Sequence, residues 1–260
     1  MTAGRAALLA MLASAVLAAS AAARTLTDPR QAWQDYLHSG AAAEPRYRFP
    51  HSNCFRAAAL AHELPETLLL AVARGESDFD ARARSKANAH GVMQILWPDT
   101  AKHLGIFRLS DLYDPCTNID AGARYLRELL QHYDGDLHLA LAAYNYGPGR
   151  IPQRANIIPE GAAWYSAYIY RHLDYVVGDR PGSNVPSSLY SELGRTPLLS
   201  FGEPYRAAAF IEGMEAKAPD VRLDWFRRGT GRFEVILTYE NKDDYDASAS
   251  RLTRAGFPIR

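Results

Sequence analysis

Apolar residues recur every three or four positions over about residues 51–178, which is the period of an amphipathic α-helix. One such stretch runs from Pro65 to about Ser77, and proline suits a first helical turn. Another begins after Asp136, a potential N-cap, and ends at the Gly-Pro-Gly of residues 147–149. A third carries a stripe formed by Ile119, Ala123, Leu126, Leu130 and Tyr133. The pattern predicts an all-α domain over residues 51–178.

The pattern changes after a segment rich in Gly, Pro, Ser and Asn. Residues 179–197 have the composition of a linker. Beyond it come an apolar run, a helical stretch, two alternating stretches, a second helical stretch and a final apolar run, at residues 198–201, 205–217, 221–225, 233–239, 244–255 and 257–259. This order predicts a small βαββαβ ferredoxin-like domain over residues 198–260. The expected fold class is therefore α+β overall.

The first 23 residues have the pattern of a secretory signal peptide. Arg5 precedes a run of small and apolar residues, 6–19, and Ala21 to Ala23 supply a cleavage site. The alternative is a membrane anchor, but a spanning helix needs about 20 strongly apolar residues and this run is mostly alanine. We therefore expect a cleaved leader over 1–23, an N-terminal extension over 24–50 and a periplasmic protein.

Composition and charge narrow the possible partners. The chain is 48% hydrophobic and 22% charged, as in an ordinary globular protein. Lys plus Arg and Asp plus Glu both number 29, so no overall field favours nucleic acid or an anionic membrane surface. We expect no nucleic-acid partner and a target recognised by local shape. No signal for an oligomer stands out, and we expect a monomer.

Two cysteines, Cys54 and Cys116, are present. In an exported protein an even pair predicts a disulfide, and two buried thiols are the alternative. The chain has no Cys-x-x-Cys and no His-Glu-x-x-His, and its eight histidines are scattered. We expect neither a metal site nor a cofactor.

Glu76 is the candidate catalytic group. Leu68, Leu69, Val72 and Ala73 precede it by eight, seven, four and three residues, which places its carboxyl on the apolar face near the helix end. Burial raises a carboxyl pKa, so that a glutamate can hold a proton and donate it to a leaving oxygen. The helix alone equally allows a terminal Glu that reaches solvent or bonds neighbouring backbone.

Three motifs surround this residue in sequence. Glu76-Ser77 is followed by Gly91-Val92-Met93-Gln94 and then by Ala143-Tyr144-Asn145-Tyr146-Gly147. In these motifs and their order, roughly residues 54–177 resemble the lytic transglycosylase family, whose SLT domain is goose-type lysozyme-like. The resemblance implies that Glu76 is the catalytic acid and base. It also implies that other side chains orient the sugar or Glu76, namely Ser77, Met93, Gln94, Tyr144, Asn145 and Tyr165.

Local alternatives exist for several of these residues. Tyr144 continues a core stripe, Asn145 can simply end its helix, and Met93 can serve packing alone. The segment before Tyr165 is one residue longer than the commonest family form, and Trp164 and Tyr168 are alternatives for the family tyrosine. The cysteine pair is most similar to members associated with secretion systems, which implies a secretion or cell-envelope assembly as a further partner.

An ordinary glycosidase needs a second carboxylate, roughly 5 to 10 Å from the first. Asp78 and Asp80 follow Glu76 but are expected to be solvated turn residues, and Asp99 is expected to cap a short helix. The resemblance implies a reaction without water, in which the muramic acid 6-hydroxyl closes a 1,6-anhydro ring on peptidoglycan glycan strands. A hydrolytic muramidase and a non-catalytic peptidoglycan-binding protein are the alternatives.

Residues 198–260 resemble the SPOR family of small peptidoglycan-binding domains. The similarity lies in the early Leu-Leu-Ser-Phe-Gly and in the closing Arg-Leu-Thr-Arg-Ala-Gly-Phe. It implies a domain that binds glycan strands and keeps the catalytic domain near them through the linker. A generic ferredoxin-like interaction module is the alternative, and exposed aromatics such as Tyr205, Trp225 and Tyr239 are candidates for stacking on sugars.

Overall fold

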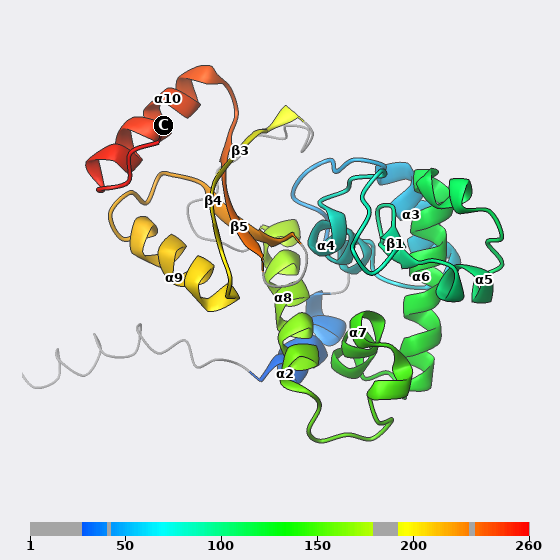
Figure 1. Cartoon of the computed structure of the whole chain (residues 1–260). Helices are drawn as coiled ribbons and strands as arrows, with labels where there is room; N and C mark the ends of the chain where they lie inside the picture. Colours follow the sequence, from blue (N-terminus) through cyan, green and yellow to red (C-terminus); the bar gives the residue numbers. More distant parts are fainter. Residues whose placement is uncertain (1–27, 41–42, 179–191, 229–231, 260) are drawn as a thin grey trace, which may run out of the picture.

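The computed structural model describes residues 28–40, 43–178, 192–228 and 232–259. The predicted signal peptide, 1–23, lies outside these residues, as does most of the predicted linker. Within the described ranges, no helix combines the length and the apolar character that crossing a membrane requires. The described chain forms a helical unit followed by a smaller unit with a three-stranded sheet (Figure 1).

The helical unit contains α-helices, short 3-10 and π turns, and one small hairpin. Its elements in order are α2 (Pro29–Asp35), η1 (Tyr36–Gly40), α3 (Ser52–Ala61), α4 (Glu66–Ser77), β1 (Ala89–His90), β2 (Ile95–Leu96), α5 (Asp99–His103), η2 (Leu109–Tyr113), α6 (Pro115–His132), α7 (Leu137–Tyr146), η3 (Pro148–Arg150) and α8 (Glu160–Val177).

Helix α4 is the centre of this unit. Residues 67–75 are all buried, so the helix is covered on every side rather than along one stripe. It packs along α8, and a Cβ at Gly75 would lie only 2.6 Å from Cδ1 of Ile169. The missing side chain at Gly75 therefore allows the two helices to approach closely just before Glu76.

The helical unit begins earlier than the predicted boundary at residue 51. Trp33 in α2 is 1% exposed, and its indole Nε1 donates to the Ser166 hydroxyl of α8 at 2.9 Å. The hydroxyls of Tyr36 and Thr67 lie 2.7 Å apart in the core. Residues 29–40 are thus part of the same core, because two large aromatic side chains anchor them there.

The predicted helix boundaries in this unit are confirmed to within one or two residues. Asp136 caps α7 by accepting from Leu139 N, and α7 ends at Gly147, whose φ is 82°. The expectation of an all-α unit is wrong in one place, because β1 and β2 form an antiparallel hairpin. Each strand has two residues, too short for an alternating pattern to be visible in the sequence.

The predicted disulfide between Cys54 and Cys116 is confirmed. It joins the start of α3 to the start of α6, with the two Cα atoms 5.0 Å apart. The bond closes a sequence separation of 62 residues, which is worth about 4 kcal/mol in the chain-entropy model. It fixes the two helices that cover the core on the side away from α8 (Figure 1).

The second unit consists of β3 (Gly194–Phe201), α9 (Pro204–Glu215), β4 (Leu223–Arg227), β5 (Phe233–Tyr239) and α10 (Lys242–Arg254). The sheet order is β3-β5-β4 and both pairings are antiparallel, so β3 and β4 run parallel on either side of β5. Figure 1 shows α9 and α10 on the side of the sheet away from α4 and α6. Five of the six predicted elements of the βαββαβ unit are present in the predicted order.

The sixth predicted element, a strand over residues 257–259, is not formed. The backbone N–H of Phe257 donates to Leu252 O at the end of α10, and the ring packs on Phe210 of α9 at 5.1 Å. Pro258 has no N–H to donate to a sheet. The N–H of Phe257 is therefore already bonded and Pro258 has none, so neither can donate to a neighbouring strand. The prediction of a strand over residues 257–259 was wrong.

The second unit also begins before the predicted residue 198. Strand β3 starts at Gly194, so residues 194–197 belong to the sheet and not to a linker. Pro197 is tolerated because β3 is an edge strand and its pairing shifts between Pro197 and Leu199. At Gly194 a Cβ would lie 2.1 Å from the Tyr239 ring.

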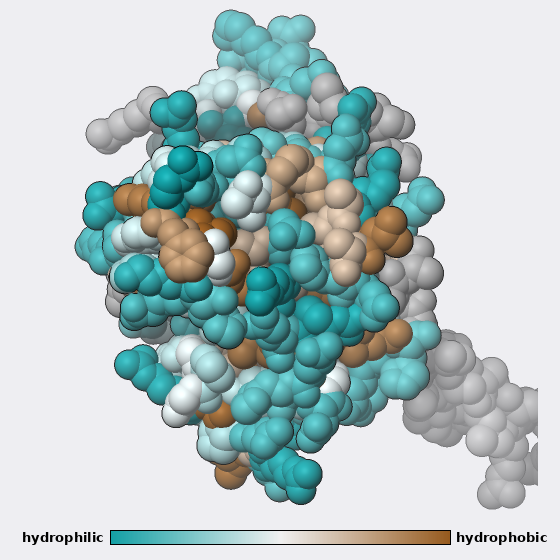
Figure 2. All heavy atoms as spheres, turned by 90° about the vertical axis from the view of Figure 1, so that its right-hand side faces the viewer, coloured by the Kyte–Doolittle hydropathy of each residue, from teal (hydrophilic) through white to brown (hydrophobic). Residues whose placement is uncertain are grey.

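The face of the helical unit that carries α5 and α6 is largely hydrophilic (Figure 2). In Figure 2 the apolar residues on the face that carries α5 and α6 form small groups between hydrophilic ones. Among the described residues, the large apolar side chains with high exposure are Leu60, Leu96, Phe107, Ile157 and Tyr205. They are spread over different elements, and scattered exposed apolar residues are normal on soluble domains.

Candidate active site

Glu76 lies in the last turn of α4 and faces inward, as predicted. Its side chain is only 7% exposed. The helix ends at Asp78, whose φ of 56° turns the chain away from the helix axis. The close approach of α8 at Gly75 brings the carboxyl of Glu76 next to the aromatic side chains of α8.

Both carboxylate oxygens of Glu76 have a partner. The Tyr165 hydroxyl of α8 donates to Oε1. Nη2 of Arg227, at the end of β4 in the second unit, lies 3.5 Å from Oε2. The guanidinium also lies over the Tyr165 ring, 5.4 Å from its centroid. Glu76 is thus held between a neutral donor from α8 and a cation from β4.

Burial raises the pKa of the Glu76 carboxyl above its usual value. The Arg227 charge and the hydrogen bond from Tyr165 lower this pKa without cancelling the effect of burial. Burial and the nearby Glu76 charge raise the pKa of Tyr165 well above its usual value, so this hydroxyl keeps its proton and remains a donor. The arrangement suits a carboxyl that donates and accepts a proton during a reaction.

Ser77 and Met93 serve the scaffold around Glu76. The Ser77 hydroxyl donates to Val92 O at 2.7 Å, which ties the end of α4 to the hairpin. Met93 is fully buried, and a Cβ at Gly122 of α6 would lie 2.6 Å from the Met93 Cβ. The structure therefore shows the Met93 side chain packed in the core against α6.

Gln94 is held by the same hairpin turn. Its side-chain Nε2 donates to Gly91 O at 2.9 Å and to Ala83 O at 3.3 Å. The turn is compact, since a Cβ at Gly91 would lie 2.3 Å from Leu112 O and from Asn118 Nδ2. Gln94 is half-buried, with its amide fixed by backbone carbonyls.

Tyr144 and Asn145 lie at the end of α7. The Tyr144 hydroxyl donates to Met93 O at 2.9 Å, and the charge of Glu76 is among the causes that raise its pKa, after burial. The Asn145 amide faces Arg227: with its oxygen turned toward the guanidinium it accepts from Nη1 and Nη2 at 3.3 and 3.2 Å. The third motif is thereby connected to Glu76 through Arg227.

The three aromatic candidates on α8 have different surroundings. Tyr165 contacts Glu76 directly. The Tyr168 hydroxyl donates to Gly75 O at 3.1 Å, and Trp164 stacks on Trp225 of β4 at 6.3 Å. The geometry therefore favours Tyr165 over its two neighbours as the partner of the carboxyl.

The aspartates near Glu76 do not all match their predictions. Asp80 is exposed and accepts from Arg82 N, as expected of a turn residue. Asp78 is not solvated: its side chain is 6% exposed and forms an ion pair with Arg195 of β3 at 3.0 Å. Asp99 is the first residue of α5 and makes no capping hydrogen bond, because Pro98 occupies the N-cap position.

Two residues of the site were not predicted from the sequence. Asn118 of α6 is completely buried, donates to His90 O and Leu112 O at 2.9 Å, and accepts from Met93 N at 2.7 Å. Its signal was available, since it is a polar residue beside the apolar stripe of α6. No sequence pattern marked Arg227 as a site residue, because β4 and α4 are brought together only in the folded protein.

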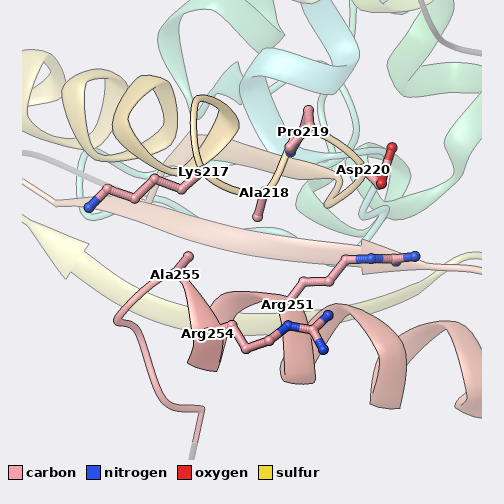
Figure 3. A pocket seen from close by; sticks show the side chains of 7 residues that line it. All are labelled: Lys217, Ala218, Pro219, Asp220, Arg251, Arg254 and Ala255. Atoms are coloured by element: carbon pink, nitrogen blue, oxygen red, sulfur yellow. The ribbon is translucent and has the colours of Figure 1, made fainter.

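One hollow in the described structure lies elsewhere. It has a volume of about 640 Å³ and is lined by Lys217, Ala218, Pro219, Asp220, Arg251, Arg254 and Ala255 (Figure 3). Figure 3 shows Lys217 and Arg251 extending in opposite directions, so the basic groups do not converge on one point. The residues that line this hollow include neither Glu76 nor its partners Tyr165 and Arg227. Among the described residues, no group of three or more His, Cys, Asp or Glu could hold a metal ion.

Comparison with known proteins points to the same part of the chain. Residues 53–164 match the family model described as Transglycosylase SLT domain. The soluble lytic murein transglycosylase of Escherichia coli strain K12 is 34% identical over 115 residues, which cover 42% of this chain and 18% of that protein. The transglycosylase of Enterobacteria phage PRD1 is 36% identical over 115 residues, covering 39% of this chain and 42% of that protein.

Among solved structures, the 70 kDa soluble lytic transglycosylase Slt70 of Escherichia coli is similar. It is 29% identical, with a TM-score of 0.44, and the match covers 48% of this chain and 24% of that one. The chain thus matches only a minor part of the length of these large relatives. The matched range contains Glu76 and the three motifs, and it ends before β4.

Proposed function

We propose that this protein is a peptidoglycan lytic transglycosylase that cleaves the β-1,4 bond between N-acetylmuramic acid and N-acetylglucosamine. The observation that carries the proposal is the buried Glu76, which lies inside the range that matches the SLT domain model and accepts a hydrogen bond from Tyr165, just beyond that range. The Escherichia coli relative, 34% identical over 115 residues, is named a soluble lytic murein transglycosylase.

The reaction uses Glu76 twice. The protonated carboxyl first donates to the glycosidic oxygen, and the bond from this oxygen to C1 of muramic acid breaks through an oxocarbenium-like transition state. The resulting carboxylate then removes the proton of the muramic acid 6-hydroxyl, and O6 bonds to C1. Glu76 regains its proton, no water is consumed, and the products are a free 4-hydroxyl and a 1,6-anhydro end.

The surroundings of Glu76 support this cycle. Burial favours the protonated form that the first step needs, while Tyr165 and Arg227 favour the carboxylate that the second step needs. Asp78, the acidic residue two positions on, is ion-paired with Arg195 and so is a poor second acid. A single carboxyl whose two forms are both accessible suits a reaction in which the sugar supplies its own nucleophile.

The test is product analysis of digested sacculi. We expect 1,6-anhydro ends, which are one water lighter than reducing ends in mass spectrometry. Glu76→Gln should lower turnover at least about 100-fold, because general acid catalysis contributes 10² to 10⁴, while binding to sacculi is retained. Glu66→Gln at the other end of α4 is the matched control and should leave turnover unchanged.

Each alternative predicts a different result. A hydrolytic muramidase would release reducing ends only. A non-catalytic glycan-binding protein would give no products from wild type, and Glu76→Gln would then change nothing.

We further propose that the protein is exported to the periplasm and that its second unit binds glycan strands in the manner of SPOR domains. The disulfide supports an oxidising compartment. Tyr205 is 68% exposed and remains a candidate for stacking on sugars, whereas Trp225 is 7% exposed and packs against α8. Binding of Glu76→Gln to denuded and to peptide-bearing sacculi tests the glycan preference. A secretion or cell-envelope partner and a monomeric state stay predictions.

A further inference from the structure

Arg227 belongs to the second unit but reaches the centre of the candidate active site. Its guanidinium lies 3.5 Å from Oε2 of Glu76, faces the Asn145 amide, and covers the Tyr165 ring. Its backbone N–H donates to the Tyr168 hydroxyl at 3.1 Å. One residue of β4 therefore contacts the carboxyl, the third motif and α8.

We propose that the second unit supplies Arg227 as a positioning residue of the active site, which holds the Glu76 carboxylate between the guanidinium and the Tyr165 hydroxyl. The inference rests on the proposed function and deepens it: the SLT-like range alone would lack a charged group that the site uses.

Strand β4 is fixed to the helical unit by a buried ion network. Asp224, three residues before Arg227, is buried between Arg74 of α4, at 2.5 Å, and Arg171 of α8. Arg171 also donates to Trp225 O. The Arg74 side chain is 2% exposed, and its guanidinium lies 3.5 Å from the centroid of the Tyr175 ring.

Aromatic packing continues this contact toward Arg227. Trp225 packs on Tyr168 at 5.4 Å and on Trp164 at 6.3 Å, and Phe226 stacks on His172 at 5.5 Å. A buried ion network and three ring contacts hold this strand in place. Strand β4 is therefore a fixed part of the site and not a mobile lid.

Arg227 is a positively charged partner of Glu76. The groups that face Glu76 are Tyr144 of α7, Tyr165 and Tyr168 of α8, and Arg227 of β4. The pKa of each of these tyrosines is raised, chiefly by burial, so they are neutral near pH 7. Tyr146 of α7 faces Arg227. Among these groups Arg227 supplies the positive charge, which favours the carboxylate form of Glu76.

The charge of Arg227 affects both proton transfers of Glu76. Burial alone would keep Glu76 protonated and would weaken it as the base for the 6-hydroxyl. Arg227 offsets part of this burial effect and orients Oε2, so that both the acid and the base step remain possible. Without Arg227, the pKa of Glu76 should rise, and the alkaline limb of the rate profile should move to higher pH because Glu76 keeps its proton longer.

The test compares Arg227→Met with Arg227→Lys and with Arg228→Met in the full chain. Arg228 is the neighbouring cation but is exposed and pairs with Glu234 of β5 at 3.4 Å, so it is the matched control. The first readout is the infrared carboxyl band of Glu76, identified by difference from Glu76→Gln, followed against pH. The second is the pH profile of anhydro-end release from sacculi.

We expect Arg227→Met to raise the midpoint of the carboxyl band by about one to two pH units, since an opposite charge at this distance shifts a pKa by one to three. Turnover should fall about tenfold or more, and its alkaline limb should move up with the band. Arg227→Lys should restore most of the midpoint, and Arg228→Met should resemble wild type. If Arg227→Met does not fold, Arg227→Gln keeps a donor without the charge and should show the same shift.

Two results would overturn the proposal. An unchanged carboxyl midpoint in the neutral variants would show that Arg227 does not act on Glu76. Higher turnover at every pH would show that β4 covers the site and that Arg227 blocks it. The infrared titration needs no turnover, so it separates failure of this inference from failure of the proposed transglycosylase activity.

Discussion

The Tyr165 hydroxyl is the group of α8 that contacts the Glu76 carboxyl. It donates to Oε1 of Glu76, while the Tyr168 hydroxyl three residues later donates to the backbone of Gly75. The two side chains leave the same helix one turn apart, yet only one reaches the carboxyl. The distinction between them lies in the side-chain contacts and not in residue type.

Tyr165→Phe removes this donor and should raise the pKa of Glu76, because the hydrogen bond favours the charged form. A hydrogen bond to a charged group is worth roughly 1.5 to 3 kcal/mol, so we expect turnover to fall about 10- to 100-fold. The measurement is anhydro-end release from sacculi alongside thermal unfolding.

Tyr133→Phe is the matched control for this prediction. Tyr133 is also buried, and its hydroxyl donates to Ile151 O at 3.0 Å, away from Glu76. It should lower stability by about 1 kcal/mol and leave turnover per folded molecule unchanged. Equal turnover in Tyr165→Phe and wild type would remove Tyr165 from the site.

The sequence allowed the inward orientation of Glu76 to be predicted, because four apolar residues share its helix face. It did not allow Arg227 to be predicted, since an arginine at the end of a short strand has the pattern of any exposed cation. Asp78 was misjudged for a related reason: its partner Arg195 lies in the second unit. Residues whose surroundings come from their own helix were predictable, and residues paired across the two units were not.

At the scale of elements, the contact between α4 and α8 depends on Gly75. Gly75→Ala would place a Cβ 2.6 Å from Ile169 Cδ1 and 3.0 Å from His172 Cδ2. Although alanine favours the helix, overpacking of a tight contact costs about 1 to 3 kcal/mol. We expect Gly75→Ala to lower the free energy of unfolding and, by moving α8 away from Glu76, to lower turnover as well.

Gly213 in α9 offers the opposite case for the same substitution. No atom lies within 4 Å of the Cβ position there. Gly213→Ala should therefore raise the stability of the second unit by about 0.5 to 1 kcal/mol through helix propensity alone. Denaturant unfolding of both variants gives the comparison, and a stabilising effect of Gly75→Ala would contradict the close helix contact.

The boundaries of helices and strands were predicted correctly where the sequence has a capping residue or a sustained hydrophobic pattern. Helix α7 was bounded by Asp136 and Gly147, and β5 by its alternation. The hairpin of β1 and β2 was missed because each strand has only two residues, too few for an alternating pattern. The final strand was wrong because an apolar run is equally suited to packing on α9, and the backbone donor of Phe257 closes α10.

At the scale of the whole molecule, the two units are docked on each other. The composition of residues 179–197 suggested a flexible linker, which would let the binding domain move relative to the catalytic domain while keeping the two close. The buried contacts of β4 with α4 and α8 instead give the second unit one fixed place. Composition could not show this docking, because the interface depends on a few side chains of β4, Asp224 and Trp225 above all. The alternation of apolar and polar residues in β4 fits a free sheet and a docked sheet equally well.

Asp224→Asn tests this docking. Burial raises the pKa of Asp224, but the charges of Arg171 and Arg74 outweigh burial and hold it well below its usual range. The variant leaves the buried Arg74 and the half-buried Arg171 without the anion between them. Breaking a buried ion pair in this way costs about 3 to 5 kcal/mol, and we expect that loss at pH 7 in urea unfolding.

The pH dependence of this loss gives the sign of the effect. Because the pKa of Asp224 is lower in the folded protein, its contribution is fully present above about pH 4, the usual value for an aspartate, and is lost as the pH falls further. The gap between wild type and Asp224→Asn should therefore be constant from pH 7 to pH 5 and should narrow at pH 3. Asp220→Asn, at an exposed position of the same unit, should show no gap at any pH. A variant Asp224→Asn as stable as Asp220→Asn at pH 7 would mean that the ion network does not hold the two units together.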